Sequence, residues 1–205
     1  MEPELFGMIR NELKRSVRLL LDQLCHEHPD DRLYAILIEV GVCGTYVIRV
    51  AGSEESLTRL AEKYIAKGYR TKSADLLEAL RSLLRWDAPG DDKYGWYWGH
   101  QEEDNKAAEL IDQAVKEGLI EEYGEVLQLR TLCLNALREL DHEGAFGVGQ
   151  ERERVLIGTC CCEYGFGEEE DVQELADLNP EATIIRLRRE LRAAEAADSM
   201  LIRPR

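Results

Sequence analysis

Three features of the sequence predict an α+β fold, with a small, mostly antiparallel sheet packed against several helices. Two stretches rich in β-branched and aromatic residues, 33–40 and 45–51, flank the glycine-containing segment 41–44, which predicts two strands joined by a turn. A third apolar stretch, residues 153–162, predicts another strand. Helical spacing of apolar residues over most of the remaining chain supplies the helices that would cover such a sheet.

The first predicted helix covers residues 4–25, where apolar side chains recur at every third or fourth position before Pro29 ends the pattern. Ser53 is a good N-cap for a second helix, and Gly68 is a good stop. Comparable patterns predict the remaining helices, which with the second cover residues 53–67, 73–84, 102–117, 125–142, 171–178 and 181–197. The last helix is strongly charged, so we expect a surface helix with ion pairs, followed by frayed Pro204 and Arg205.

The organisation of the chain indicates one domain. Its 205 residues suit a single core, and no repeat or linker rich in proline, glycine or serine interrupts them. We therefore expect a single domain over residues 1–205, with the core at residues 5–180 and the charged helix 181–197 after it.

The net charge restricts the class of partner. The chain carries 41 acidic and 26 basic residues, for a formal charge of −15. Phosphates and anionic lipids would be repelled, so we expect no nucleic acid and no membrane as partner, and a basic protein would be attracted. The acidic start of the chain lacks a leader pattern and no apolar run is long enough to span a membrane, which predicts a cytoplasmic protein.

The six cysteines do not form a metal-binding pattern. Cys160, Cys161 and Cys162 are adjacent, so on a strand they alternate between faces, and no Cys-x-x-Cys pair occurs elsewhere. We expect reduced thiols, no metal and no cofactor, while a redox or metal role for these three cysteines stays open. The motifs of serine hydrolases, nucleotide-binding loops and zinc proteases are also missing. The glycine-rich segment 144–149 predicts a helix C-cap and a turn that returns Phe146 to the core.

All three tryptophans lie within one segment, residues 86–98, which is rich in glycine and aspartate and lacks helical periodicity. Tryptophan and tyrosine are the side chains most enriched at the centre of protein interfaces. The candidate partner-binding residues are therefore Trp86, Asp91, Asp92, Tyr94, Trp96, Tyr97 and Trp98. Of these, Trp86 directly follows a leucine-rich helix and is expected to be the most core-like, whereas the 94–98 run is the better candidate for contact.

Four short motifs, which we call landmarks, occur one after another along the chain. They are Leu33-Tyr34-Ala35-Ile36, Arg85-Trp86-Asp87-Ala88-Pro89, Glu143-Gly144-Ala145-Phe146-Gly147, and Leu178-Asn179-Pro180. This order resembles the bacterial family catalogued as domain of unknown function 4303, over residues 5–180. The segment after Pro89 departs from the family pattern, because Trp96 and Trp98 follow an inserted Gly90-Asp91-Asp92-Lys93. The resemblance implies a bacterial cytoplasmic α+β protein and carries no catalytic residue over.

Two hypotheses for function follow. The first is an acidic protein-binding domain, similar in kind to the immunity proteins that neutralise a toxin partner in toxin–antitoxin systems, with the aromatic segment as contact surface. The alternative is an enzyme of unrecognised type, with a pocket under residues 86–100 and with His100, Asp87 or a cysteine as acid–base groups. If the aromatic segment has only a structural role, the function lies in another part of the chain.

Overall fold

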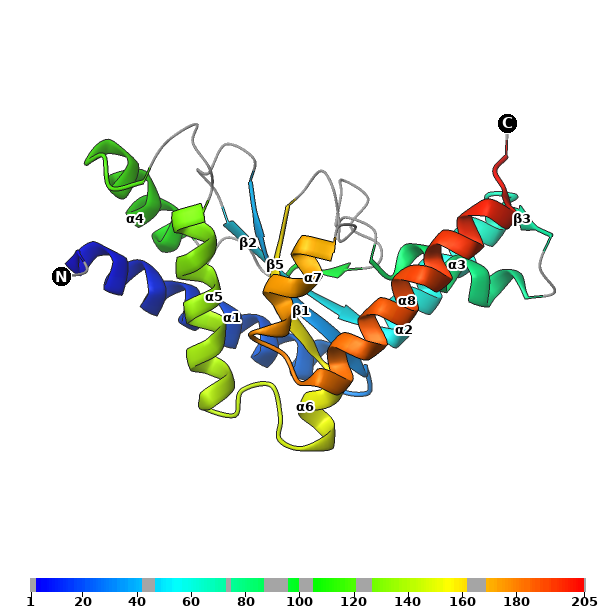
Figure 1. The fold of residues 1–205 in the computed structure, drawn as a ribbon, viewed down its shortest axis with the longest axis horizontal. Helices are drawn as coiled ribbons and strands as arrows, with labels where there is room; N and C mark the ends of the chain where they lie inside the picture. The colour runs from blue at the N-terminus through cyan, green and yellow to red at the C-terminus, as the bar shows by residue number, and fades with distance from the viewer. Residues whose placement is uncertain are drawn as a thin grey trace.

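The computed structural model describes residues 3–41, 47–72, 75–86, 96–99, 105–120, 127–161 and 169–204. Within them the fold is α+β, as the sequence predicts: a four-stranded sheet lies between two groups of helices (Figure 1). The helices α1, α4 and α5 lie on one side of the sheet, and α2, α3 and α8 lie on the other.

The sheet has the strand order β4-β2-β1-β5. Strands β1 (Leu33–Val40) and β2 (Val47–Ser53) pair antiparallel, which confirms the two neighbouring strands that the sequence predicts. Strand β4 (Trp96–Tyr97) pairs antiparallel with β2, and β5 (Leu156–Cys161) pairs parallel with β1. The sheet is therefore mixed but mostly antiparallel, with β5 drawn from a distant part of the chain.

One face of the sheet carries what we call the α1 core. It is built by α1 (Glu4–Glu27), α4 (Asn105–Lys116) and α5 (Leu127–His142), packed against alternate residues of the strands. The predicted spacing of α1 is confirmed, because its buried apolar side chains are Leu5, Ile9, Leu13, Val17, Leu20 and Leu24. They contact strand residues such as Ile36 and Ile38 within this core.

The opposite face carries the Tyr34 core. Helices α2 (Glu54–Ala66), α3 (Leu76–Leu84), α7 (Glu169–Ala176) and α8 (Glu181–Met200) contribute to it. Ser53 caps α2 as expected, since its hydroxyl accepts the Ser56 amide and its own amide donates back to Ser56. The C-terminal helix is more than a solvated surface helix: Ile184 and Leu187 are buried in the Tyr34 core.

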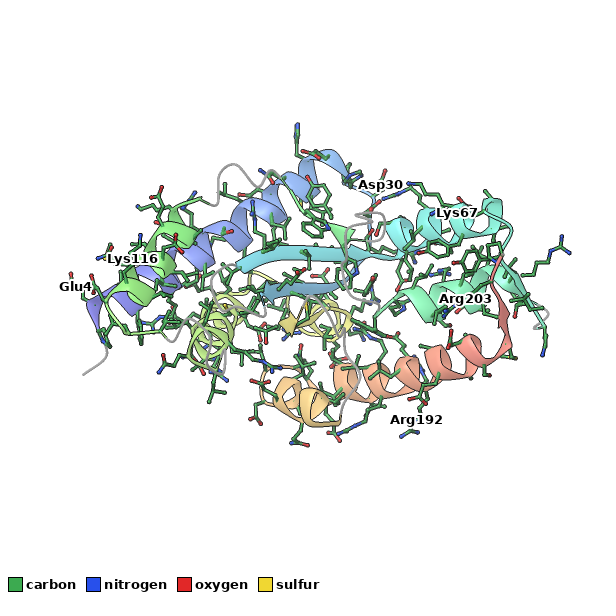
Figure 2. All side chains as sticks on the ribbon, turned by 90° about the horizontal axis from the view of Figure 1, so that it is seen from above. Glu4, Asp30, Lys67, Lys116, Arg192 and Arg203 are labelled. Carbon is green, nitrogen blue, oxygen red and sulfur yellow. The ribbon has the colours of Figure 1, made fainter. Side chains whose placement is uncertain are left out.

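The sequence prediction was wrong at one boundary. Residues expected at the start of the third strand belong to a short helix, α6 (Gln150–Arg154), because the charged run there ends before the apolar run begins. A pairing that the sequence did not predict follows α8, where β6 (Leu201–Ile202) pairs with β3 (Arg70–Thr71) in a second, two-stranded sheet. Figure 2 shows the result, with Arg203 lying at the same end of the molecule as Lys67.

Asn179 secures β5, which lies at an edge of the sheet. Its side-chain oxygen accepts from the Ile157 amide at 2.9 Å, and its nitrogen donates to the Ile157 carbonyl at 2.7 Å. The buried Arg152 guanidinium donates to the same Asn179 oxygen and to the carbonyls of Val155 and Leu178. The side chains thus take the place of a further strand along β5, whose backbone groups would otherwise be buried without partners.

Replacing Asn179 with alanine is expected to lower the free energy of unfolding by about 2 to 3 kcal/mol, because two buried backbone groups lose their partners. The measurement is urea denaturation followed by circular dichroism. Asn135→Ala is the matched control, since Asn135 accepts one hydrogen bond from Arg138 on the surface of α5. Equal losses in the two variants would show that Asn179 does not secure the strand.

Among the described residues, no helix combines the length and the apolar character that crossing a membrane requires.

Candidate functional site

Four of the aromatic residues singled out in the sequence are described by the structure. Trp86 follows α3, while Trp96 and Tyr97 form β4 and Trp98 comes directly after it. Asp91, Asp92 and Tyr94 lie outside the described residues, as do Asp87 and His100 of the alternative hypothesis.

Trp86 and Trp96 both pack on Tyr34. Each indole meets the Tyr34 ring edge to face, with centroids 5.4 Å apart for Trp86 and 5.8 Å apart for Trp96. Trp86 is 4% exposed and Trp96 is 7% exposed. Gly52 on β2 makes room for this arrangement, since a Cβ there would come within 2.5 Å of the Tyr34 ring. The core position expected for Trp86 is confirmed, and Trp96, expected in the contact run, shares it.

Charged side chains close the edge of the Tyr34 core. Glu54 accepts two hydrogen bonds from Arg85, at 2.6 and 2.7 Å, and one from Arg81 at 2.7 Å. The Arg85 guanidinium also lies over the Tyr34 ring at 4.7 Å. Burial would raise the pKa of Glu54, but Arg85 and Arg81 outweigh it and hold that pKa below its ordinary value.

The last member of this network is Glu190 on α8. Trp86 donates its indole N–H to Glu190 at 3.2 Å, and burial raises the pKa of that carboxyl despite Arg85 and Arg186 nearby. The Arg-Trp landmark therefore joins α3 to α2, β1 and α8. These contacts show that the Arg-Trp landmark stabilises the fold.

Tyr97 and its neighbours form an acidic and aromatic surface that we call the Tyr97 patch, made of Glu27, His28, Asp30 and Tyr97. The Tyr97 hydroxyl donates to Glu27 at 2.7 Å, and the His28 ring lies edge to face with the Tyr97 ring at 5.4 Å. Burial and the Glu27 carboxylate raise the pKa of Tyr97 to about 12. Glu27 and Asp30 are exposed, and Figure 2 shows Asp30 beyond the end of α1.

Glu39 is the residue that sequence reasoning missed. It lies near the carboxyl end of β1, is 3% exposed, and receives no hydrogen bond or ion pair from the described residues. Burial alone raises its pKa to about 7. A signal was present in the sequence, because Glu39 is the only charged residue in the strand Leu-Tyr-Ala-Ile-Leu-Ile-Glu-Val.

Strand alternation determines what surrounds Glu39. It is paired with Ile48 on β2 and with Cys160 on β5, and all three belong to the side of the Tyr34 core. The buried Arg49 is paired with Ile38 and therefore lies on the α1 side of the sheet. Two buried charges of opposite sign thus lie one register step apart but on opposite faces.

The cysteines are dispersed. Cys160 is buried in the Tyr34 core, Cys133 is buried in the α1 core, and Cys25 is exposed on α1. Burial raises the pKa of the Cys133 thiol, which leaves it protonated. Cys43, Cys162 and the side chain of Cys161 fall outside what the structure describes, and the described side chains contain no group of three potential metal ligands.

A groove of about 490 Å³ lies away from the aromatic residues. It runs between α1 and the turn after α5, with Leu21, Ile36 and Phe146 among its apolar lining. The Arg18–Glu143 ion pair lies in its wall. Cys25, Asp22 and Glu143 are among its polar lining, and it is a different place from the pocket under residues 86–100 that the enzyme hypothesis expects.

Comparison with known proteins gives a family without an activity. The family model described as Domain of unknown function (DUF4303) matches residues 13–180. That range contains the Tyr34 core strands, Glu39, the Tyr97 patch and Asn179. No curated protein and no solved structure matches the chain.

Proposed function

Because this chain belongs to the Domain of unknown function (DUF4303) family, no activity comes to it from relatives, and we propose a function from its own residues. It is an acidic binding protein of the cytoplasm, and its partner is a basic protein. The most concrete form is an immunity-like protein that covers and neutralises a toxin.

The charge excess is the observation that carries this proposal. The formal charge is −15, and many of the described cations are already used inside the chain. Lys14 binds Glu139 and Glu143, and Arg152 binds Asp141. Such internal pairs leave the excess of carboxylates on the surface, where they would attract a basic protein and speed its association.

The Tyr97 patch is the proposed centre of contact. It offers a partly exposed aromatic ring held in place by Glu27 and His28, with the exposed Asp30 two residues after His28 in the chain. A rigid aromatic side chain bordered by carboxylates is suited to receive a lysine or arginine side chain. Trp98, which is partly exposed and packs against the Tyr34 core, is the second candidate anchor. Trp86 and Trp96 lie on the other face of the sheet, in the Tyr34 core, and are not part of the proposed contact.

The test is to isolate the partner from the native host and to measure its affinity for the wild type and for Tyr97→Ala by calorimetry. If Tyr97 is an anchor, its loss weakens binding by about 2 kcal/mol or more. Binding should also weaken steeply as salt is raised. For a toxin partner, the wild type should restore growth to cells that express the toxin.

The matched control is Tyr69→Ala. Tyr69 is another partly exposed tyrosine, packed on Tyr64 just after the end of α2 and outside the Tyr97 patch. An acidic partner, affinity that salt does not change, or equal losses in the two tyrosine variants would contradict the proposal.

Glu39 favours a second candidate function, an enzyme. A buried carboxyl with a pKa of about 7 is suited to accept and return a proton near neutral pH. The test is a screen of hydrolytic and proton-transfer substrates with the wild type and Glu39→Gln. Turnover by the wild type that Glu39→Gln abolishes, in the absence of any basic protein partner, would establish this function in place of the first.

A further inference from the structure

We propose that Glu39 is the anion of a binding site for an organic cation, a ligand group of the ammonium or guanidinium class. Glu39 is buried without a compensating partner among the described residues. Its Oε2 atom is fully buried, and no donor or cation among the described residues reaches it. A charge removed from water without a partner costs far more than a paired one, so such a carboxyl is suited to a ligand that brings the missing charge.

The fold separates Glu39 from the nearest buried cation along the strands. Arg49 is also buried, yet its register places it with Leu13 and Val17 of α1, across the sheet. Three half-buried arginines on the Tyr34 side, Arg81, Arg85 and Arg186, form their ion pairs with Glu54 or Glu190.

The strand neighbours of Glu39 on this face are Ile48 and Cys160, and both are apolar. Apolar side chains beside one carboxylate favour an organic cation, because its hydrocarbon part packs against them while its charge meets the carboxylate. A magnesium or calcium ion needs several oxygen ligands, and the described residues around Glu39 do not provide them.

The position also agrees with a binding site. β1 and β5 run parallel, and Glu39 and Cys160 lie near the carboxyl ends of the two strands. Ligand sites in sheets with parallel strands are commonly built at these ends.

The test uses the full chain and two probes, n-butylammonium and n-butylguanidinium, with pentan-1-ol as a neutral ligand of similar length. Calorimetry measures binding, and NMR of the carbon-13-labelled side-chain carboxyl of Glu39 reports the site. We expect the wild type to bind at least one of the two cations in preference to the alcohol, with a change in the Glu39 signal. Glu39→Gln should lose about tenfold or more in affinity, equivalent to about 1.4 kcal/mol.

Glu62→Gln is the matched control, because Glu62 is an exposed carboxyl on α2. It should bind the cations like the wild type. Glu39→Leu is the second variant and should also fail to bind. Absence of cation binding by the wild type, unchanged affinity in Glu39→Gln, or Glu39-dependent binding of magnesium in place of the organic cations would each overturn the proposal.

A second titration, with the basic partner present, identifies the source of the cation. If the probes compete with the partner, the site takes a lysine or arginine side chain of that partner. If the probes bind and the partner is unaffected, the site serves a free small amine. The first titration needs no partner, so the site and the proposed function can fail separately.

Discussion

Trp96→Ala is expected to lower the free energy of unfolding by about 3–5 kcal/mol, the range for removing a buried tryptophan from a core. The indole fills space against Tyr34, opposite Gly52, and its loss leaves a cavity at the β4 edge of the Tyr34 core. Urea denaturation followed by circular dichroism is the measurement.

The matched control is Trp98→Ala, because Trp98 lies two residues later and is partly exposed. It should cost less stability than Trp96→Ala and more partner affinity. Unchanged stability in Trp96→Ala, together with lost partner binding, would return Trp96 to the contact surface that its sequence position indicated.

Glu39→Gln is expected to change the dependence of stability on pH. The pKa of Glu39 is about 7 in the folded chain, against an ordinary value of 4.5. Between these values the folded state holds a proton that the unfolded state has released, so stability falls as pH rises from 4.5 and the loss is complete above about 7. The full loss is about 3 kcal/mol, since each pKa unit corresponds to about 1.4 kcal/mol.

Glutamine has no charge to bury, so the variant should be more stable than the wild type by up to about 3 kcal/mol at about pH 8 and nearly equal to it at about pH 5. Denaturation curves at the two pH values measure this. Glu62→Gln should show no such difference between them. A Glu39→Gln effect of the same size at both pH values would mean that Glu39 is not a buried ionising group.

A residue that lowers stability at neutral pH is a candidate for function, because sites often conflict with the rules that stabilise the fold. Glu39 is such a residue. The landmark residues of the family differ from it, because their positions stabilise the fold. Tyr34, Trp86, Phe146 and Asn179 all have positions that the fold itself explains. The residues that give the family its pattern therefore stabilise the fold, and their contacts do not indicate a chemical reaction.

The sequence predicted much of the local structure for a physical reason. Periodicity is written into consecutive residues, so the spacing in α1 and the apolar run of β1 were visible without a fold. Ser53 and Phe146 were also predictable, because a cap depends on its immediate neighbours and an apolar residue after a helix stop returns to the core.

The candidate site was less predictable. The cluster of tryptophans indicated an important segment, but burial depends on what lies opposite, and Tyr34 is about fifty positions before Trp86. Nothing local could show that Trp96 meets the same ring. Glu39 was visible in the sequence of β1. That no hydrogen-bond partner among the described residues reaches its buried Oε2 atom could be recognised only in the structure.

The sequence by itself determined the composition of the elements, the α+β class and the strong negative charge, because these depend on residue types and on neighbours along the chain. Only the tertiary structure decided that β5 joins β1 in parallel, that Trp96 belongs to the core, and that Glu39 and Arg49 lie on opposite faces. The physical reason is that pairing between distant segments sets which side chains share a face. That pairing follows from the packing of the whole chain.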